Sequence, residues 1–417
     1  MLHSLGRGLT CAATNTSSQL SPIASIDSAL KTVALIGDSI TSQNDSSNKQ
    51  EFTSQGYMTW LNALTGQRYY YDPSYNLGAS GQAIASTLSN ITDLAALSPA
   101  PDLVFYIPFA NDITGSRSYA DLIADLDAII AYVTGTLGAK MVIGTPLPRT
   151  QDNGNGLTTA QQTLSNNLRS YIMSLNVSGV TPVNIYDNMT STGDNPDTYL
   201  FDDEGGKYLH PTPAGAYQIA LDMKDALDNV FGTNAIPDMS ICALGLNSDL
   251  SGTGGSESSP LTSAQVADNW RFYSYSGLNG TVTKTPEGHQ FIHVSYTNSR
   301  SFDLWELQAT DITSGFALGD DYYMEAEIKI LSSANVRTAA CLEPTLNASG
   351  SYKAMSPYDV NAWPLGFSGT LHLRTPIFTI SSSDTTIDPI VWAQMNSLGV
   401  TSNSHVVIKA VRMVKVN

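Results

Sequence analysis

A Gly37-Asp38-Ser39-Ile40 turn directly after a short apolar run constrains the fold of this chain more than any other feature. The run, residues 32–36, is continuous and rich in apolar and β-branched residues, which is typical of a strand buried on both faces of a parallel sheet. A serine at the carboxyl end of such a strand lies at the sheet edge where open α/β folds bind ligands. Ser39 is therefore a candidate nucleophile, although a lone Gly-Asp-Ser triplet also arises by chance in a Ser-rich chain.

Length and composition favour two globular domains. A chain of 417 residues exceeds the usual size of one domain, and its 42% of apolar residues suffice for buried cores. No stretch approaches the roughly 18 apolar residues of a membrane helix, so we expect no membrane span. The net charge of −17 argues against nucleic acid as a partner, because phosphates repel an acidic surface.

The hydrophobic pattern changes near residue 235 and divides the chain. Over residues 31–235 apolar runs alternate with helical patterns, which predicts an α/β domain with a parallel sheet covered by helices on both faces. Its expected strands are residues 33–36, 69–71, 103–107, 141–143 and 183–186. Its expected helices are residues 56–64, 83–97, 119–137, 159–175 and 213–230.

The two remaining regions have different patterns. Residues 236–417 contain β-type runs without helical periodicity, which predicts an antiparallel β-sandwich after a loop or linker at 252–260. Its expected strands are residues 270–275, 291–296, 322–330, 371–380 and 406–416. Residues 1–30 form a polar N-terminal extension without a convincing signal-peptide core. Cys11, Cys242 and Cys341 are far apart, so we favour free thiols over one disulfide.

One histidine, His210, occurs between Ser4 and Gly288, so a histidine base for Ser39 must be His210. It stands in His210-Pro211-Thr212-Pro213, at the start of the last predicted helix of the α/β domain. Taken alone, it is better interpreted as a surface histidine beside a turn. Together with a serine at the sheet edge, it is better interpreted as a general base.

Acyl transfer also needs hydrogen-bond donors for the oxyanion that develops in the transition state. The segment from Asn76 to Gly81 is a glycine-rich turn after the second strand, and Gly81 offers an unshielded backbone N–H. Asn111 follows the third strand and offers a carboxamide. As alternatives, the glycines serve only a tight turn and Asn111 only caps a helix.

Taken in order, these segments resemble the SGNH, or GDSL-type, hydrolase family of esterases over about residues 31–232. The resemblance implies a flavodoxin-like three-layer α/β/α fold, with Ser39 as nucleophile and His210 as base. It also implies an oxyanion hole made by the N–H groups of Ser39 and Gly81 and the side chain of Asn111. No metal-ligand spacing or phosphate-binding loop occurs in this half, so we expect no metal and no cofactor.

Two positions depart from the family pattern. Phe109 stands where the family usually has glycine, which is expected to reshape the pocket. Lys207 stands three residues before the histidine, where the family has an aspartate, and a lysine cannot stabilise an imidazolium. We prefer Asp203 as the acid, because Gly205-Gly206 lets the loop fold back. Asp202, Glu204 and a Ser–His dyad without an acid remain open.

The second domain contains four of the five tryptophans, namely Trp270, Trp305, Trp363 and Trp392. Residues 247–270 resemble the opening of jelly-roll carbohydrate-binding modules and of modules in phage tail proteins that carry SGNH domains. The tryptophans are either sugar platforms or core residues, and the sequence leaves both interpretations open.

These observations favour a serine esterase that removes acyl groups, O-acetyl above all, from a polysaccharide or a small ester. A glycan-binding adhesin or virion tail component without activity is one alternative, motivated by Lys207, and a lipid acylhydrolase is another. An extracellular or virion-associated location follows from this hypothesis. A homo-oligomer is expected if the protein is a tail component.

Overall fold

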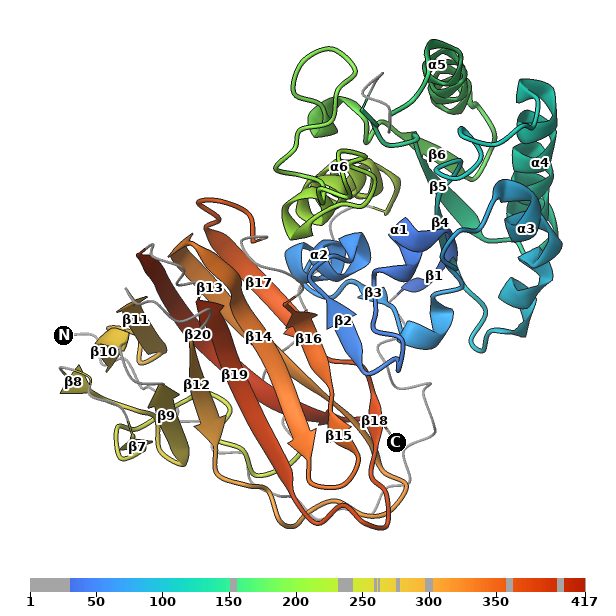
Figure 1. Cartoon of the computed structure of the whole chain (residues 1–417). Helices are drawn as coiled ribbons and strands as arrows, with labels where there is room; N and C mark the ends of the chain where they lie inside the picture. Colours follow the sequence, from blue (N-terminus) through green and yellow to red (C-terminus); the bar gives the residue numbers. More distant parts are fainter. Residues whose placement is uncertain are drawn as a thin grey trace, which may run out of the picture. The chain divides into compact units, whose positions relative to one another are not determined.

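The computed structural model describes residues 31–150, 156–231, 243–258, 261, 263–274, 278–296, 303–357, 363–395 and 401–416. The chain divides into two compact units, over residues 29–235 and 236–417 (Figure 1). The predicted extension 1–30, with Cys11, and Cys242 lie outside the described residues, whereas Cys341 is buried. Among the described residues, no helix is long and apolar enough to cross a membrane.

The first unit is built on a parallel sheet of five strands in the order β3-β1-β4-β5-β6, which confirms the predicted α/β fold. The strands are β1 Lys31–Gly37, β3 Tyr69–Tyr70, β4 Leu103–Ile107, β5 Lys140–Gly144 and β6 Val180–Val183. β1 and β4 pair in register over five residues, and nearly all their side chains are buried. The carboxyl ends of β1, β4 and β5 therefore meet at one sheet edge.

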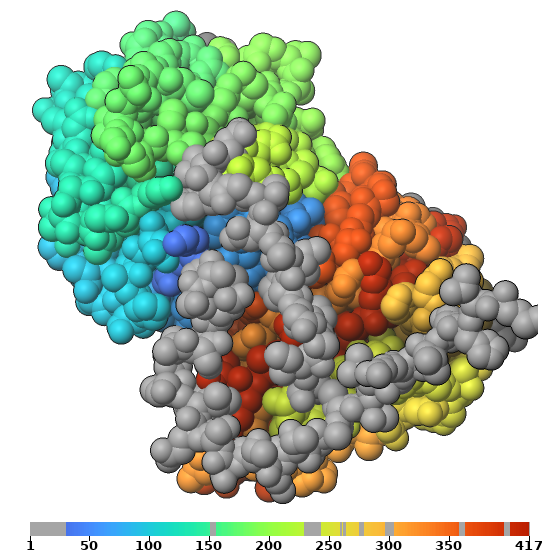
Figure 2. Space-filling model, turned by 180° about the vertical axis from the view of Figure 1, so that it is seen from behind, coloured from blue at the N-terminus to red at the C-terminus, as the bar shows by residue number. Residues whose placement is uncertain are grey.

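Helices cover both faces of this sheet (Figure 1). The α-helices are α1 Ser39–Ser42, α2 Tyr57–Leu64, α3 Ile84–Ser89, α4 Tyr119–Ala131, α5 Thr159–Ser174 and α6 Pro213–Phe231. The shorter elements are β2 Glu51–Thr53, η1 Pro73–Tyr75, η2 Ile91–Ala96, the π-helical turn η3 Tyr132–Thr136 and η4 Asp187–Met189. Helix α2 packs against α6, and α4 packs against α3 and α5. In the space-filling view this unit forms a continuous surface from blue to green (Figure 2).

Two predicted elements of the first unit differ in detail. The helix expected over residues 83–97 is interrupted at Asn90, which ends α3 before η2 begins. Asparagine favours helix ends because its side chain competes for backbone groups. The strand expected at 183–186 is instead β6 Val180–Val183, so the chain leaves the sheet where an edge strand was expected to start.

The second unit consists of two mainly antiparallel sheets, consistent with the predicted sandwich. One sheet has the order β17-β13-β20-β11-β10-β8, with β18 paired to β13. Its strands are β8 Ser263–Ala264, β10 Leu278–Lys284, β11 Gln290–Tyr296, β13 Asp321–Ala334, β17 Gly369–Arg374, β18 Phe378–Thr379 and β20 Ser402–Lys415. In β11 buried residues alternate with partly exposed ones, as in a strand with one face on a core.

The other sheet includes the order β16-β14-β19-β12-β9-β7, with β15 paired to β14. Its strands are β7 Ser256–Glu257, β9 Trp270–Ser274, β12 Asp303–Ala309, β14 Val336–Leu346, β15 Gly350–Ser351, β16 Lys353–Ser356 and β19 Ile387–Met395. The predicted loop or linker at 252–260 belongs to this unit, because β7 pairs with β9.

Sequence analysis missed several strands of the second unit, including β14 and β19. Both contain a proline, and Pro344 and Pro389 stand opposite each other in the pairing. Proline removes a backbone donor and normally argues against a strand interior. Because the two prolines face each other, the missing backbone N–H groups of both strands fall at one pair of residues in the sheet.

The four tryptophans of this unit are all buried, with exposed fractions of 9% or less. Trp270 also donates its Nε1–H to the carbonyl oxygen of Asn247 at 3.0 Å. Buried indole rings stabilise a core. The structure therefore favours the core interpretation of these tryptophans over exposed sugar platforms.

Candidate active site

Ser39 is the first residue of the short helix α1, directly after the carboxyl end of β1. Asp38 caps this helix: its Oδ1 accepts the Ile40 N–H at 2.9 Å. Gly37 has a φ of +144°, and a Cβ there would lie 2.4 Å from Thr41 Oγ1. The turn therefore needs glycine, and it brings Ser39 out at the sheet edge, where it is partly exposed.

The structure brings Ser39 and His210 together, although 171 positions separate them in the sequence. Ser39 Oγ and His210 Nε2 lie 2.7 Å apart, within hydrogen-bond distance. His210 ends a loop in front of α6, and Phe201 and Pro211 pair across the base of this loop. The hydroxyl is therefore placed to pass its proton to the imidazole.

The carboxylate at the other ring nitrogen belongs to Glu204, whose Oε1 contacts His210 Nδ1. The preferred residue, Asp203, is bound elsewhere: its Oδ1 accepts the Gly206 N–H at 2.7 Å. Asp202 donates its N–H to the His210 carbonyl at 2.8 Å, which closes the loop. The prediction that Asp203 is the acid that contacts His210 is therefore wrong, because that contact is made by Glu204.

The glycine pair in this loop explains why Glu204 reaches the ring. Gly205 and Gly206 have φ values of +69° and +83°, which reverse the chain directly after Glu204. The Asp203 carboxylate accepts the Gly206 N–H within this turn. It therefore stabilises the turn and does not contact the imidazole. Sequence analysis recognised that the glycines fold the loop back, but the residue that faces His210 depends on the turn geometry.

The two predicted donor segments contact each other at the edge of the sheet. Asn111 Nδ2 donates to the carbonyl oxygen of Gln82 at 3.1 Å, next to Gly81. Gly81 has a φ of +76°, and a Cβ added there would meet no other atom within 4 Å, so backbone conformation rather than space requires glycine. Within the described residues, no protein acceptor is found for the N–H of Ser39 or Gly81.

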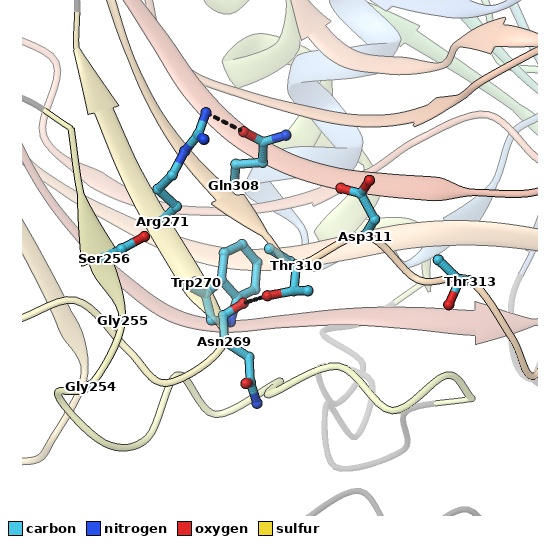
Figure 3. A pocket seen from close by; sticks show the side chains of 11 residues that line it. Gly254, Gly255, Ser256, Asn269, Trp270, Arg271, Gln308, Thr310, Asp311 and Thr313 are labelled. Carbon is cyan, nitrogen blue, oxygen red and sulfur yellow. Dashed lines mark hydrogen bonds between the residues drawn. The ribbon is translucent and has the colours of Figure 1, made fainter.

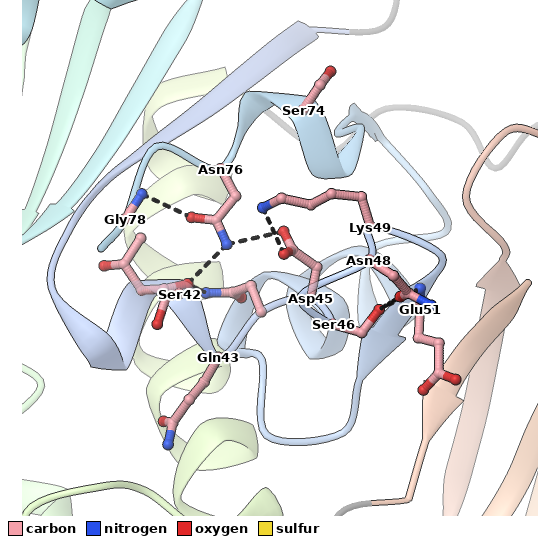
Figure 4. Close-up of polar contacts among 12 residues, drawn as sticks. Ser42, Gln43, Asp45, Ser46, Asn48, Lys49, Glu51, Ser74, Asn76 and Gly78 are labelled. Atoms are coloured by element: carbon pink, nitrogen blue, oxygen red, sulfur yellow. Dashed lines mark hydrogen bonds and ion pairs between the residues drawn. The ribbon is translucent and has the colours of Figure 1, made fainter. Parts of the chain in front are cut away.

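A buried polar network supports the segment from Asn76 to Gly81 (Figure 4). Asn76 Nδ2 donates to Asp45 Oδ2 at 2.9 Å and to the Thr41 carbonyl at 3.0 Å. Asn76 Oδ1 accepts the Gly78 N–H at 3.0 Å, which sets the turn. Burial raises the pKa of Asp45, whereas its hydrogen bonds with Lys49, Asn76 and Tyr71 lower it. Sequence analysis missed Asp45, because nothing near it in the chain indicates this role.

Burial also dominates the electrostatics beside Ser39. It raises the pKa of Asp38 to about 6, and the hydrogen bond from Ile40 opposes this shift. Arg149 lies near enough to interact with Asp38 and Glu204, while burial lowers the pKa of its guanidinium. Acidic and basic groups thus lie close together around the serine. Among the described residues, no group of three or more His, Cys, Asp or Glu side chains could hold a metal ion.

Phe109 occupies the position where the resembling family has glycine, and its backbone explains that preference. Its φ is +78°, a left-handed conformation that glycine adopts freely and that costs phenylalanine of the order of 1–3 kcal/mol. The ring is 2% exposed. The side chain that was expected to reshape the pocket is therefore buried in the protein.

Ser39, His210 and Glu204 place a hydroxyl, an imidazole and a carboxylate in series at the carboxyl edge of the parallel sheet. Hydrolases that transfer acyl groups use a site of this type. Residues 35–217 match the model of the GDSL-like Lipase/Acylhydrolase family. Residues 35–217 therefore form a GDSL-like lipase/acylhydrolase domain, and the enzyme class of this domain is that of the carboxylic ester hydrolases. Among curated proteins, none is significantly similar to this sequence.

Several solved structures resemble about half of the chain. A GDSL-like lipase from Bacteroides thetaiotaomicron VPI-5482 is 19% identical, with 48% of this chain and 89% of that chain covered and a TM-score of 0.34. A member of the lipolytic protein G-D-S-L family from Veillonella parvula DSM 2008 is 17% identical, with 46% and 96% covered and a TM-score of 0.32. A carbohydrate esterase family 3 protein from Talaromyces cellulolyticus is 15% identical, with 49% and 100% covered and a TM-score of 0.36. Likenesses at this level carry no argument about substrate.

Proposed function

We propose that the protein is a serine esterase in which Ser39 is the nucleophile, His210 the general base and Glu204 the acid that orients His210. The observation that carries this proposal is the 2.7 Å contact of Ser39 Oγ with His210 Nε2, together with the Glu204 carboxylate at Nδ1. A carboxylate at Nδ1 holds the ring with Nε2 free to accept a proton. It also stabilises the imidazolium that follows.

The reaction has two halves. Ser39 Oγ attacks the ester carbonyl while His210 Nε2 takes the serine proton, and the tetrahedral intermediate collapses as the imidazolium protonates the leaving alcohol. Water then attacks the acyl-serine, with the same imidazole as base, and the acid leaves. The N–H groups of Ser39 and Gly81 and the second Nδ2–H of Asn111 are the proposed oxyanion donors.

Hydrolysis of p-nitrophenyl acetate by the full chain tests this mechanism. Ser39→Ala is expected to lose activity by several orders of magnitude, because no other nucleophile replaces the hydroxyl. Ser86→Ala, in the exposed part of α3, is the matched control and should retain wild-type activity. Equal hydrolysis by wild type and Ser39→Ala would end the proposal.

For the substrate, we propose an O-acyl ester, acetyl above all, on a polysaccharide that the second unit binds. A surface groove of about 670 Å³ in that unit supports this proposal (Figure 3). Its polar lining side chains are those of Ser256, Asn269, Arg271, Gln308, Thr310, Asp311 and Thr313. Amide, guanidinium and carboxylate groups pair with neighbouring sugar hydroxyls as donors and acceptors.

Hydrogen bonds connect the residues that line the groove. Arg271 Nη2 donates to Gln308 Oε1 at 3.3 Å, and Thr310 donates twice to the Asn269 carbonyl, from N at 2.8 Å and from Oγ1 at 3.0 Å. Full-length Arg271→Ala and Asp311→Ala should bind insoluble acetylated xylan more weakly than wild type and hydrolyse p-nitrophenyl acetate equally well. Undiminished retention of both variants would refute binding at this groove. It would leave the esterase proposal standing.

Two alternatives are less well supported. The inactive adhesin or virion tail component was motivated by Lys207, but Glu204 supplies the acid that Lys207 cannot. A lipid acylhydrolase would prefer long acyl chains, so rates on a series of p-nitrophenyl esters decide between it and an acetylesterase. The extracellular or virion-associated location and a homo-oligomeric state stay proposals, and light scattering on the purified chain tests the second.

A further inference from the structure

Arg149 and Thr150 are consecutive residues after strand β5. Their side chains bind two segments of the candidate site, the Asn111 turn and the Glu204 loop. Arg149 Nη1 donates to the carbonyl oxygen of Ala110 at 2.9 Å. Thr150 Oγ1 donates to the carbonyl oxygens of Gly206 at 2.7 Å and Lys207 at 3.3 Å. We call this pair the Arg149–Thr150 clamp. One of its contacts lies next to Asn111, and the other lies two residues beyond Glu204.

The Glu204 loop needs support from outside itself. Glu204 is six residues before His210 and is followed by two glycines with positive φ, which give the loop many alternative conformations. The Glu204 side chain is also 36% exposed, so packing alone does not hold it. Thr150 Oγ1 donates to the carbonyl oxygens of Gly206 and Lys207, and this contact restrains the loop on the side of the glycine turn that follows Glu204.

The Asn111 turn receives comparable support from Arg149. The Ala110 carbonyl that Arg149 binds belongs to the peptide bond that leads into Asn111. Arg149 is partly buried, and within the described residues no carboxylate lies within 4.0 Å of its guanidinium. Its hydrogen bond thus goes to a carbonyl beside the proposed oxyanion donor, rather than to an ion-pair partner.

We propose that the Arg149–Thr150 clamp positions the catalytic groups, with Thr150 acting through Glu204 on His210 and Arg149 acting through the Ala110 carbonyl on Asn111. This inference rests on the proposed serine esterase function. Glu204 lies six residues before His210 and two glycines lie between them, so the chain between them is flexible and the clamp supplies the rigidity. Neither clamp residue takes a proton or bonds to substrate in this proposal.

Double-mutant cycles on the full chain separate these roles from a general structural effect. Thr150→Val should lower kcat for p-nitrophenyl acetate about 5- to 10-fold with little change in KM, because the one hydroxyl proton that Gly206 and Lys207 share is lost. Thr150→Ser should restore it. In a Glu204→Gln background Thr150→Val should have no further effect, because its route to His210 is already removed.

Arg149→Met should lower kcat by a similar factor, and Arg149→Lys should restore part of it. This effect should disappear in the Asn111→Ala background, because its route through the Ala110 carbonyl is then removed. Thr163→Val is the matched control, because the exposed Thr163 in α5 also donates from its Oγ1 to a backbone carbonyl, that of Thr159. It should leave kcat unchanged.

The rate at which a fluorophosphonate labels Ser39 provides a second readout that does not depend on substrate. Labelling should slow with kcat in Thr150→Val. If Thr150→Val does not fold, Thr150→Ala carries the same test. Wild-type kcat in the Thr150 and Arg149 variants would refute the clamp and leave the esterase proposal intact. The same holds if the effect of Thr150→Val adds fully to that of Glu204→Gln, or if the effect of Arg149→Met adds fully to that of Asn111→Ala. Full activity of Ser39→Ala would instead refute the esterase proposal itself.

Discussion

Replacement of Glu204 by glutamine removes one charge from the site and nearly preserves its shape. The charge matters when His210 holds the Ser39 proton, because carboxylate and imidazolium then form an ion pair. Two unit charges about 4 Å apart interact by about 4 kcal/mol at an effective dielectric constant near 20, and by about 1 kcal/mol in water. The Glu204 side chain is 36% exposed and that of His210 is 20% exposed. The interaction therefore lies between these limits, at about 2–3 kcal/mol.

This energy stabilises the transition state more than the ground state, so it acts on kcat. Glu204→Gln is expected to lower kcat for p-nitrophenyl acetate roughly 30- to 150-fold with little change in KM. Asp203→Asn is the matched control, because Asp203 is an adjacent acid that binds the Gly206 N–H instead of the imidazole. It should lower kcat by less than about 3-fold. A larger loss in Asp203→Asn than in Glu204→Gln would refute the assignment of Glu204.

Three further predictions concern the backbone and the buried charge around Ser39. Burial raises the pKa of Asp38 to about 6, so the native state holds the proton that the unfolded state has lost between about pH 4 and pH 6. The free energy of unfolding that this residue contributes should therefore fall by about 3 kcal/mol as pH rises through that window. Urea unfolding measures it as the difference in unfolding free energy between wild type and Asp38→Asn at each pH. A difference that does not change with pH would contradict this prediction. Gly81→Ala should destabilise the protein by about 1–2 kcal/mol, because φ at this position is +76° even though there is space for a Cβ. It should also lower kcat. Unchanged stability and kcat would show that the positive φ is not required. Phe109→Gly relieves the strain of a left-handed phenylalanine but removes a buried ring. We expect the free energy of unfolding in urea to fall by about 2–3 kcal/mol. A stabilised variant would show that the strain outweighs the packing.

The parallel sheet of the first unit was predictable because its strands are continuous apolar runs. Residues 33–36 and 103–107 are buried on both faces in β1 and β4, as their composition indicates. In the second unit the same approach missed β10, β12, β14 and β19; β14 and β19 contain Pro344 and Pro389, which stand opposite each other in the pairing. That each proline faces the other is a property of the pairing, which the sequence of one strand does not show.

The candidate site divides in the same manner. Ser39 and His210 could be proposed together because the first unit contains a single histidine and one Gly-Asp-Ser turn after a strand. The acid could not be chosen, because Asp202, Asp203 and Glu204 are consecutive and chemically equivalent in the sequence. Asp45, Arg149 and Thr150 gave no local signal at all. Each acts on a group that lies far away along the chain.

The sequence alone determined which chemical groups are present at each strand end, since burial of apolar runs and the needs of tight turns are local properties. The tertiary structure decided which of these groups meet. The reversal at Gly205-Gly206, supported by Thr150, selects Glu204 from three adjacent acids. Burial selects the core role of the tryptophans over a surface role. Both choices depend on contacts between distant segments, which form only when the chain has folded.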